Sequence, residues 1–215
     1  MVYALLPNKS EASYSKMLTL LSEKIISHPE FINTDFELAA INAFRSTFPK
    51  TVFNGCYFHF VQNLWKNVQN KKLVNDYNKD KTFRQSFRQL QCLAFIPHKD
   101  VIFAFKSVTI NSPGSFLPMI TYFEKYYIGN LCKNSNTKRK VPIFPIKCWS
   151  VYARIIKGEP RTNNNLEAWH KQFEVDARIH PTVNKLIQQF RLEQKNTEVL
   201  LSQLEVGDNY SRKKL

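Results

Sequence analysis

The sequence predicts a helix-rich α/β fold, in which short parallel strands are followed by a long helical segment. Short apolar runs alternate with helical stripes over residues 2–70, as is typical of strands joined by helical crossovers. Residues 71 to 160 carry helical stripes and no convincing series of strands. The 215 residues are 43% hydrophobic and include 17 Phe, which supplies a packed core and excludes wholesale disorder.

Each element expected in residues 2–70 follows from an apolar pattern and from a residue that ends it. Pro49 and the pair His28-Pro29 end two helices, because proline lacks a backbone N–H and restricts the residue before it. The strands do not alternate strictly between apolar and polar residues, which favours a sheet covered on both faces. The expected strands are 2–6, 31–34 and 51–54, and the expected helices are 14–25, 36–48 and 57–68.

The rest of the chain is expected to be helical. Residues 101–108 are ambiguous between helix and strand, and their helical neighbours favour a helix. A helix from Trp149 to Ile156 is expected to end at Gly158, and Thr162 is a suitable N-cap for the helix that follows. A last helix is expected after Pro181.

These changes of pattern divide the chain into four segments. We expect an α/β core at 1–70, an all-α insertion at 71–160, C-terminal helices at 161–205 and a basic tail at 206–215.

Basic residues outnumber acidic ones, 31 against 17, so the formal charge is +14. Such an excess attracts polyanions, which favours nucleic acid as the partner, and a generally basic protein is the alternative. Half of the excess lies in residues 133–161, where eight basic residues accompany one acid. The candidate nucleic-acid contacts in this segment are Lys138, Arg139, Lys140, Lys147, Arg154, Lys157 and Arg161, and Lys133 belongs to the same basic run.

The compartment is indicated by the cysteines and by the lack of long apolar runs. Cys56, Cys92, Cys132 and Cys148 stand far apart, which does not favour a disulfide framework. No apolar run approaches the roughly 18–20 residues of a membrane span. We expect a soluble, intracellular protein without a membrane partner.

Most aromatic residues are expected in the core, because they lie on helical stripes. Tyr126, Tyr127 and Tyr152 are near basic residues, so stacking on nucleic-acid bases is an alternative for them.

Two acidic residues are candidates for chemistry. Asp35 stands where an apolar strand gives way to a helix, and ligand-binding residues collect at the carboxyl ends of parallel strands. The competing interpretation of Asp35 is a helix N-cap. Glu167 follows a run of three Asn at a helix start, where such residues cap the helix or bind a ligand. The competing interpretation of Glu167 is a solvated acid.

Cys56 and His59 are spaced by three residues, which places them on one side of a helix start. Both residue types bind zinc, but a zinc site would need further ligands such as Cys148 or His170, and neither stands in a recognised spacing. A buried Cys56 and a solvated His59 are the alternatives.

Taken together, these segments resemble the transposase domain of Mutator-like elements, the MULE family, over residues 2–195. The resemblance is carried by five sequence segments. They are Thr34-Asp35-Phe36-Glu37, Cys56-Tyr57-Phe58-His59, Arg161-Thr162-Asn163-Asn164, Glu167 and Trp169-His170. The resemblance implies a ribonuclease-H-like fold, interrupted by a helical insertion at 71–160.

The resemblance also implies a catalytic role for both acids. Asp35 would be the second acid of an Asp-Asp-Glu triad and Glu167 the third, both binding Mg²⁺ or Mn²⁺. Cys56 and His59 would form the family's Cys-x-x-His element. Asn163, Asn164 and His170 would belong to the motif around the third acid. Such a triad holds two divalent ions that cleave and transfer DNA strands.

The chain departs from the family pattern at its start. The family's first acid lies on an earlier strand, and no Asp of this chain stands in that order. The resemblance therefore implies a partial fold that lacks its first strands and leaves an open sheet edge at 2–6. We expect the chain alone to bind no metal ion and to be inactive.

The resulting expectation is a fragment or relic of a Mutator-like DNA transposase. A domesticated module that binds DNA or protein without cutting is the alternative. DNA is the expected partner, self-association through the last helix is a further hypothesis, and the resemblance and charge imply a nuclear protein.

Overall fold

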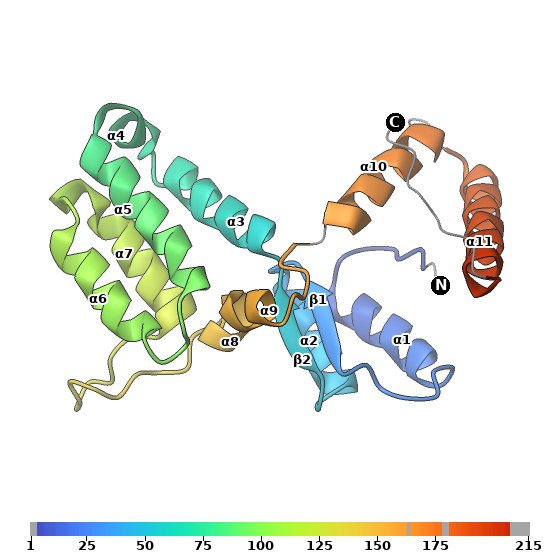
Figure 1. Cartoon of the computed structure of the whole chain (residues 1–215), viewed down its shortest axis with the longest axis horizontal. Coiled ribbons are helices and arrows are strands. Elements are labelled where there is room, and N and C mark those ends of the chain that lie inside the picture. Colours follow the sequence, from blue (N-terminus) through green and yellow to red (C-terminus); the bar gives the residue numbers. More distant parts are fainter. Residues whose placement is uncertain (1–3, 163, 178–180, 207–215) are drawn as a thin grey trace. The chain divides into compact units, whose positions relative to one another are not determined.

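The computed structural model describes residues 4–162, 164–177 and 181–206 (Figure 1). The chain is divided into two compact units. One is Leu6–Asn163, and the other combines Met1–Leu5 with Asn164–Leu215.

The sheet of the first unit has two parallel strands, β1 (Phe31–Thr34) and β2 (Val52–Gly55). Helix α2 (Leu38–Thr47) connects them, as the alternation of apolar runs and helical stripes predicts. The register pairs Phe31 with Val52 and Thr34 with Gly55. The helix-rich α/β class is therefore confirmed. Among the described residues, β1 and β2 make up the sheet.

The strand expected at 2–6 is not found in the part of it that the structure describes. Ala4–Leu6 have no regular structure, and the earlier residues of that expected strand lie outside the described part. Leu5 is 60% exposed, so the apolar pattern there does not mark a buried strand.

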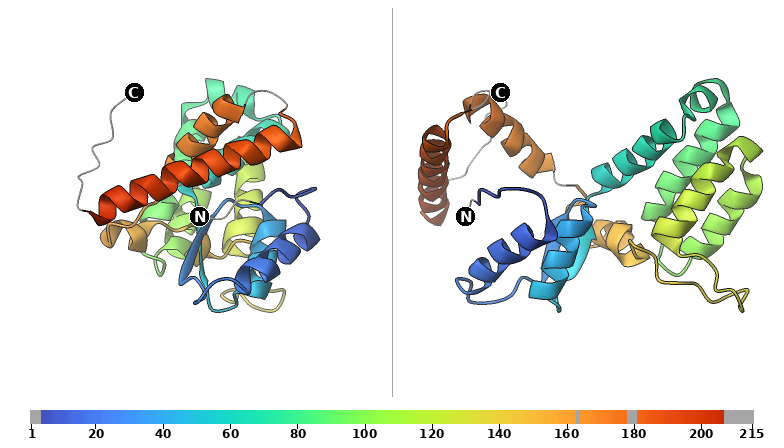
Figure 2. Two further views of the ribbon diagram at one scale, coloured as in Figure 1. Left: turned by 90° about the vertical axis from the view of Figure 1, so that its right-hand side faces the viewer. Right: turned by 180° about the vertical axis from the view of Figure 1, so that it is seen from behind.

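Helix α1 (Glu11–Ser22) precedes the sheet and packs against α2 (Figure 2). Ser10 caps it, since its side chain accepts a hydrogen bond from the Ser13 N–H. Leu18, Ala43 and Phe48 form a small buried core between these helices.

A helical bundle follows the sheet. Its α-helices are α3 (Tyr57–Asn70), α4 (Val74–Lys79), α5 (Lys81–Cys92), α6 (Val101–Asn111) and α7 (Leu117–Phe123). Shorter turns are the 3-10 helices Leu93–Phe95 and Gly114–Phe116 and the π-helix Glu124–Ile128. The ambiguous segment 101–108 is thus helical, as its neighbours indicate.

One aromatic core joins the sheet to this bundle. The rings of Phe60 and Trp149 stack with centroids 5.3 Å apart, and Tyr127 meets Phe60 edge-on at the same distance. The indole N–H of Trp149 donates to the Tyr127 carbonyl at 3.2 Å. All three residues are fully buried, so elements from both sides of residue 70 share a single core.

The expectation of one helix from Trp149 to Ile156 is wrong. The structure has two short helices, α8 (Ile146–Trp149) and α9 (Tyr152–Ile156). The chain is extended at Ser150, and the Val151 N–H donates to the Ala94 carbonyl at 2.8 Å instead of continuing a helix. Gly158 then follows α9 with φ +69°, in the left-handed region that glycine adopts readily.

The second unit contains α10 (Asn164–Ala177) and α11 (Val183–Glu205). Phe173 and Phe190 stack at 5.2 Å, and the Trp169 indole donates to the Glu193 carboxylate at 3.0 Å. Thr182 caps α11 by accepting from the Lys185 N–H.

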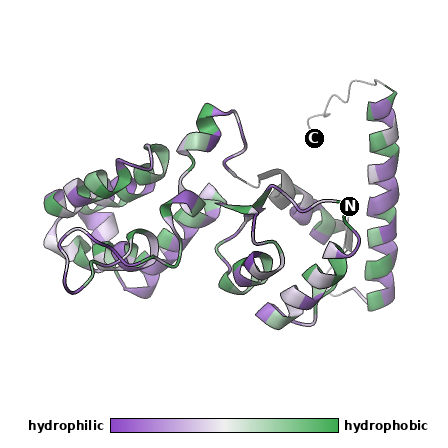
Figure 3. Cartoon of the chain, turned by 90° about the horizontal axis from the view of Figure 1, so that it is seen from below, coloured by the Kyte–Doolittle hydropathy of each residue, from purple (hydrophilic) through white to green (hydrophobic). Residues whose placement is uncertain are grey.

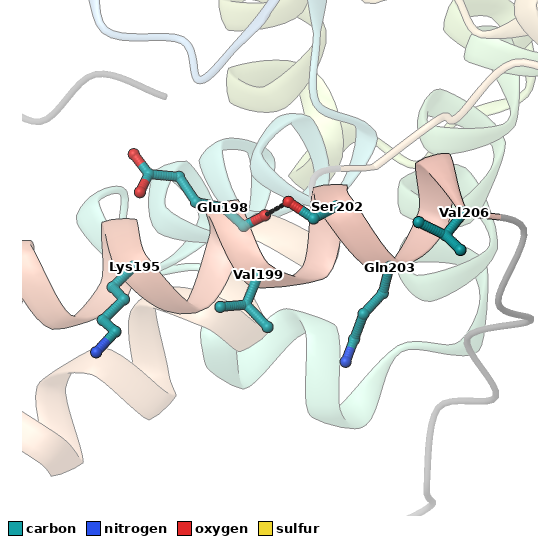
Figure 4. Close-up of a pocket in the computed structure, with 6 residues that line it drawn as sticks. All are labelled: Lys195, Glu198, Val199, Ser202, Gln203 and Val206. Carbon is teal, nitrogen blue, oxygen red and sulfur yellow. Dashed lines mark hydrogen bonds between the residues drawn. The ribbon is translucent and has the colours of Figure 1, made fainter.

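Helix α11 alternates polar and apolar residues along its length and has no buried residue (Figure 3). Its last turns line a shallow, open pocket (Figure 4). The pocket is lined by Lys195, Glu198, Val199, Ser202, Gln203 and Val206. Among the described residues, no helix is both long and apolar enough to cross a membrane.

Candidate functional site

The candidate site lies at the carboxyl edge of the two-stranded sheet. Asp35 directly follows β1, and Cys56 directly follows β2. Because the strands are parallel, their carboxyl ends meet at one edge. The Cys56 N–H donates to the Thr34 carbonyl at 3.0 Å and closes the ladder there.

Asp35 and His59 meet at this edge. The His59 Nδ1 atom lies 2.8 Å from Oδ1 of Asp35. The side chain of Asp35 is 52% exposed and that of His59 is 23% exposed, so the carboxylate faces solvent while the imidazole supports it from α3. The sequence identified both residues as separate candidates, and the fold joins them.

The N-cap interpretation of Asp35 is wrong. The N-cap of α2 is Glu37, and it makes no side-chain capping bond. The Glu37 carboxylate instead accepts a hydrogen bond from the Tyr14 hydroxyl at 3.0 Å. Asp35 therefore stands free of the helix start, with its carboxylate directed to His59.

Cys56 is buried, as one of the two alternatives for it predicts. It is 1% exposed at the N-cap of α3, and Cys148 on α8 is 4% exposed. Burial raises the pKa of the Cys148 thiol, which disfavours a thiolate there. Among the described residues, no three His, Cys, Asp or Glu side chains are grouped to hold a metal ion, so they supply no structural zinc site.

Arg154 occupies a position that its sequence context does not suggest. It is 5% exposed, and its Nη2 donates to the Gly55 carbonyl at 2.8 Å. Its Nη1 donates to the Pro160 carbonyl at 3.4 Å. Burial lowers the pKa of the Arg154 guanidinium below its usual range.

Arg154 is therefore removed from the expected nucleic-acid contacts, because its guanidinium points into the protein. No local pattern marks Arg154 as buried, because the carbonyls that it binds belong to Gly55 and Pro160.

Gly55 allows this close packing at the end of β2. A Cβ at Gly55 would lie 2.4 Å from the ring of Phe36 and 3.0 Å from the Cys148 carbonyl. The lack of a side chain lets α8 and Phe36 approach the strand end.

The segment that leads to the third expected acid begins near this edge. The Tyr57 N–H, in the first turn of α3, donates to the Arg161 carbonyl at 3.0 Å. Asn163 and the side chains of Asn164 and Glu167 lie outside the described part. His170 is exposed on α10, in the second unit.

The other expected nucleic-acid contacts differ in their surroundings. Five of them are exposed, namely Lys138, Lys140, Lys147, Lys157 and Arg161. Arg139 is instead held by Glu124, with Nη1 2.6 Å from Oε1. Tyr127 is fully buried and unavailable for base stacking, and Tyr126 is half-buried beside Lys125.

The described residues do not form a complete site for two divalent ions. Mg²⁺ and Mn²⁺ prefer several carboxylate or carbonyl oxygens, and the sheet edge offers one carboxylate, Asp35, beside an imidazole. A two-ion site would need further carboxylates.

Part of the chain matches a known protein family. Residues 1–63 match the model of the MULE transposase domain. The matched segment contains both strands, Asp35, Cys56 and His59. Searches of curated proteins and of solved structures find no match.

Proposed function

We propose that this chain is part of a Mutator-like DNA transposase, an enzyme that cuts and joins DNA strands with divalent ions. One observation carries the proposal. The segment that matches the MULE transposase domain contains the Asp35–His59 pair, at the edge of a parallel sheet where α/β proteins bind ligands.

In this proposal Asp35 is the second carboxylate of the triad, and Glu167 is the third. Asp35 is supported by its exposed position at the strand end and by His59 at 2.8 Å, which holds one carboxylate oxygen. Glu167 is supported by the sequence motif around it. When bound, Mg²⁺ or Mn²⁺ would activate the attacking oxygen and stabilise the leaving one.

His59 and Arg154 act as positioning residues in the same proposal. His59 orients the Asp35 carboxylate from the first turn of α3. Arg154 fixes the end of β2 through the Gly55 carbonyl and the segment before α10 through the Pro160 carbonyl. Both residues would keep the sheet edge rigid, because catalytic carboxylates need a fixed geometry.

We expect the 215-residue chain alone to bind DNA without cutting it. It offers two of the three family carboxylates, and two ions need more oxygen ligands than that. The measurement is nicking of supercoiled plasmid in Mg²⁺ or Mn²⁺, beside DNA binding, for the wild type and Asp35→Ala. The expected result is binding by both proteins and background nicking by both.

Two other outcomes would change this view. Metal-dependent nicking that is lost in Asp35→Ala would support the transposase chemistry and refute the expected inactivity. Absence of both nicking and DNA binding would overturn the proposed function.

The second candidate is a DNA-binding module that never cuts. It is favoured by the exposed lysines of residues 133–161. DNA binding that persists when Asp35 and Glu167 are both replaced is expected for either function. The transposase and the DNA-binding module are distinguished only by a nicking assay on a protein that has all three carboxylates of the triad. Either function is consistent with the nuclear localisation that we propose.

A further inference from the structure

We infer that residues 129–140, named here the basic hairpin, form a preordered contact for the phosphate backbone of duplex DNA. The inference rests on the DNA binding proposed above and assigns it to one element.

Backbone hydrogen bonds build the basic hairpin. Leu131 and Arg139 form an antiparallel bridge, the Lys140 N–H donates to the Asn130 carbonyl at 2.8 Å, and the Cys132 N–H donates to the Lys138 carbonyl at 2.9 Å. At its tip, the Ser135 hydroxyl accepts from the N–H groups of Thr137 and Lys138. The basic hairpin is therefore a closed turn that is held by its own hydrogen bonds.

Arg139 ties the basic hairpin to the bundle. Its Nη1 lies 2.6 Å from the Glu124 carboxylate and donates to the Gly129 carbonyl at 2.6 Å. The Arg139 side chain is only 10% exposed. The charge of Arg139 is thus paired with Glu124. Arg139 holds in place the backbone that carries the neighbouring lysines.

Gly129 makes the return of the hairpin possible. Its φ is +90°, and a Cβ there would lie 1.8 Å from the Lys140 carbonyl oxygen. A side chain at this position would therefore push away the segment that carries Lys138 and Lys140.

The charges left on the surface are of one sign. Lys133, Lys138 and Lys140 are exposed, and residues 125–158 contain no Asp or Glu. Asn134 and Asn136 add amide groups that hydrogen-bond phosphate oxygens. A hairpin that is already ordered loses little conformational entropy on binding. Lysines act as point charges, so the expected contact is to the backbone and independent of base sequence.

The first experiment measures binding of a fluorescent 30-bp duplex by the whole chain at several salt concentrations. The test variant replaces Lys133, Lys138 and Lys140 by Gln, and the control variant replaces the exposed Lys9, Lys16 and Lys24 by Gln. Both lose the same charge. A plot of the logarithm of the binding constant against the logarithm of the salt concentration has a negative slope. We expect this slope to become less negative by about 2.7 in the test variant and to change little in the control.

The second experiment disturbs the conformation of the basic hairpin without changing its charge. Gly129→Ala is expected to weaken binding about tenfold, because the hairpin must then be ordered on binding. Gly114→Ala is the control, since a Cβ there meets nothing within 4 Å. Arg139→Met repeats the comparison in case Gly129→Ala fails to fold. Its control is Lys50→Met, at an exposed lysine outside residues 133–161, so that both variants lose one positive charge.

The outcomes separate this inference from the proposed function. Equal slopes for the two triple variants would overturn the inference and leave DNA binding elsewhere on the chain. Unchanged affinity in both Gly129→Ala and Arg139→Met would refute the preordering. A wild type with no duplex binding, or with binding to an acidic polypeptide alone, would refute DNA binding itself.

Discussion

Asp35 and His59 illustrate what a single residue pair contributes. Each had an ordinary alternative in the sequence, a helix cap for Asp35 and a solvated side chain for His59. Their approach to 2.8 Å removes the first alternative and gives His59 a defined partner. Neither fact follows from spacing along the chain, because the two residues are 24 positions apart and a crossover helix lies between them.

Arg154 leads to a prediction about stability at the same scale. Arg154→Lys keeps a buried charge but loses the planar fork that reaches the Gly55 and Pro160 carbonyls. We expect it to lower the free energy of unfolding by about 1.5–3 kcal/mol, measured by urea denaturation.

The control for Arg154→Lys is Lys157→Arg, at a side chain that is 69% exposed. This change is expected to stay within about 0.5 kcal/mol of the wild type. Equal stability of both variants would show that the Arg154 hydrogen bonds contribute nothing measurable.

The pair of helices in the second unit shows what an element contributes. Helix α11 has no buried residue, and its contact with α10 depends on Phe173, Phe190 and the Trp169–Glu193 hydrogen bond. Isolated helices are marginal in water, so this contact must supply much of their order.

Phe190→Ala is therefore expected to raise amide hydrogen exchange throughout α11 by about tenfold, because the stacked ring of Phe173 loses its partner. Exchange measured by mass spectrometry tests this, with α5 as the internal reference. Leu192→Ala is the control, because Leu192 is 52% exposed on the same helix. Equal exchange in the two variants would contradict the assigned contact.

At the scale of the whole molecule, the first unit has a core that crosses the sequence boundary expected near residue 70. Phe60 of α3 stacks on Trp149 of α8, and Trp149 also donates to Tyr127 of the bundle. Phe53 of β2 is half-buried and packs against the same core, so the sheet and the bundle are joined through it.

Trp149→Ala is expected to cost about 3–5 kcal/mol, and the strands and the bundle are expected to lose protection together. Hydrogen exchange of residues 31–70 and 83–123 during urea unfolding tests this. Phe103→Ala is the control, because Phe103 is 76% exposed. Independent unfolding of the two segments would show that the shared core does not couple them.

The fold was predictable wherever a local pattern repeats within one element. Helices α3, α5 and α11 and strands β1 and β2 follow from apolar spacing and from caps or prolines. The pattern of α6 fits a helix or a strand, and only its helical neighbours indicate the helix. The break at Ser150 was not predictable, because a hydrogen bond from Val151 to the distant Ala94 carbonyl decides it. Residues 4–6, the described part of the strand expected at 2–6, form no strand, because an apolar run specifies a strand only when a neighbouring strand pairs with it.

The α/β class, the positive charge of residues 133–161 and the candidates Asp35, Cys56 and His59 could all be inferred from the amino-acid sequence. These features depend on composition and on local periodicity, and both are properties of each sequence segment alone. Which basic residues are exposed could be seen only in the folded chain. It buries Arg154, anchors Arg139 and leaves the lysines of the hairpin exposed. The physical reason is that burial and ion pairing depend on atoms brought from distant parts of the chain.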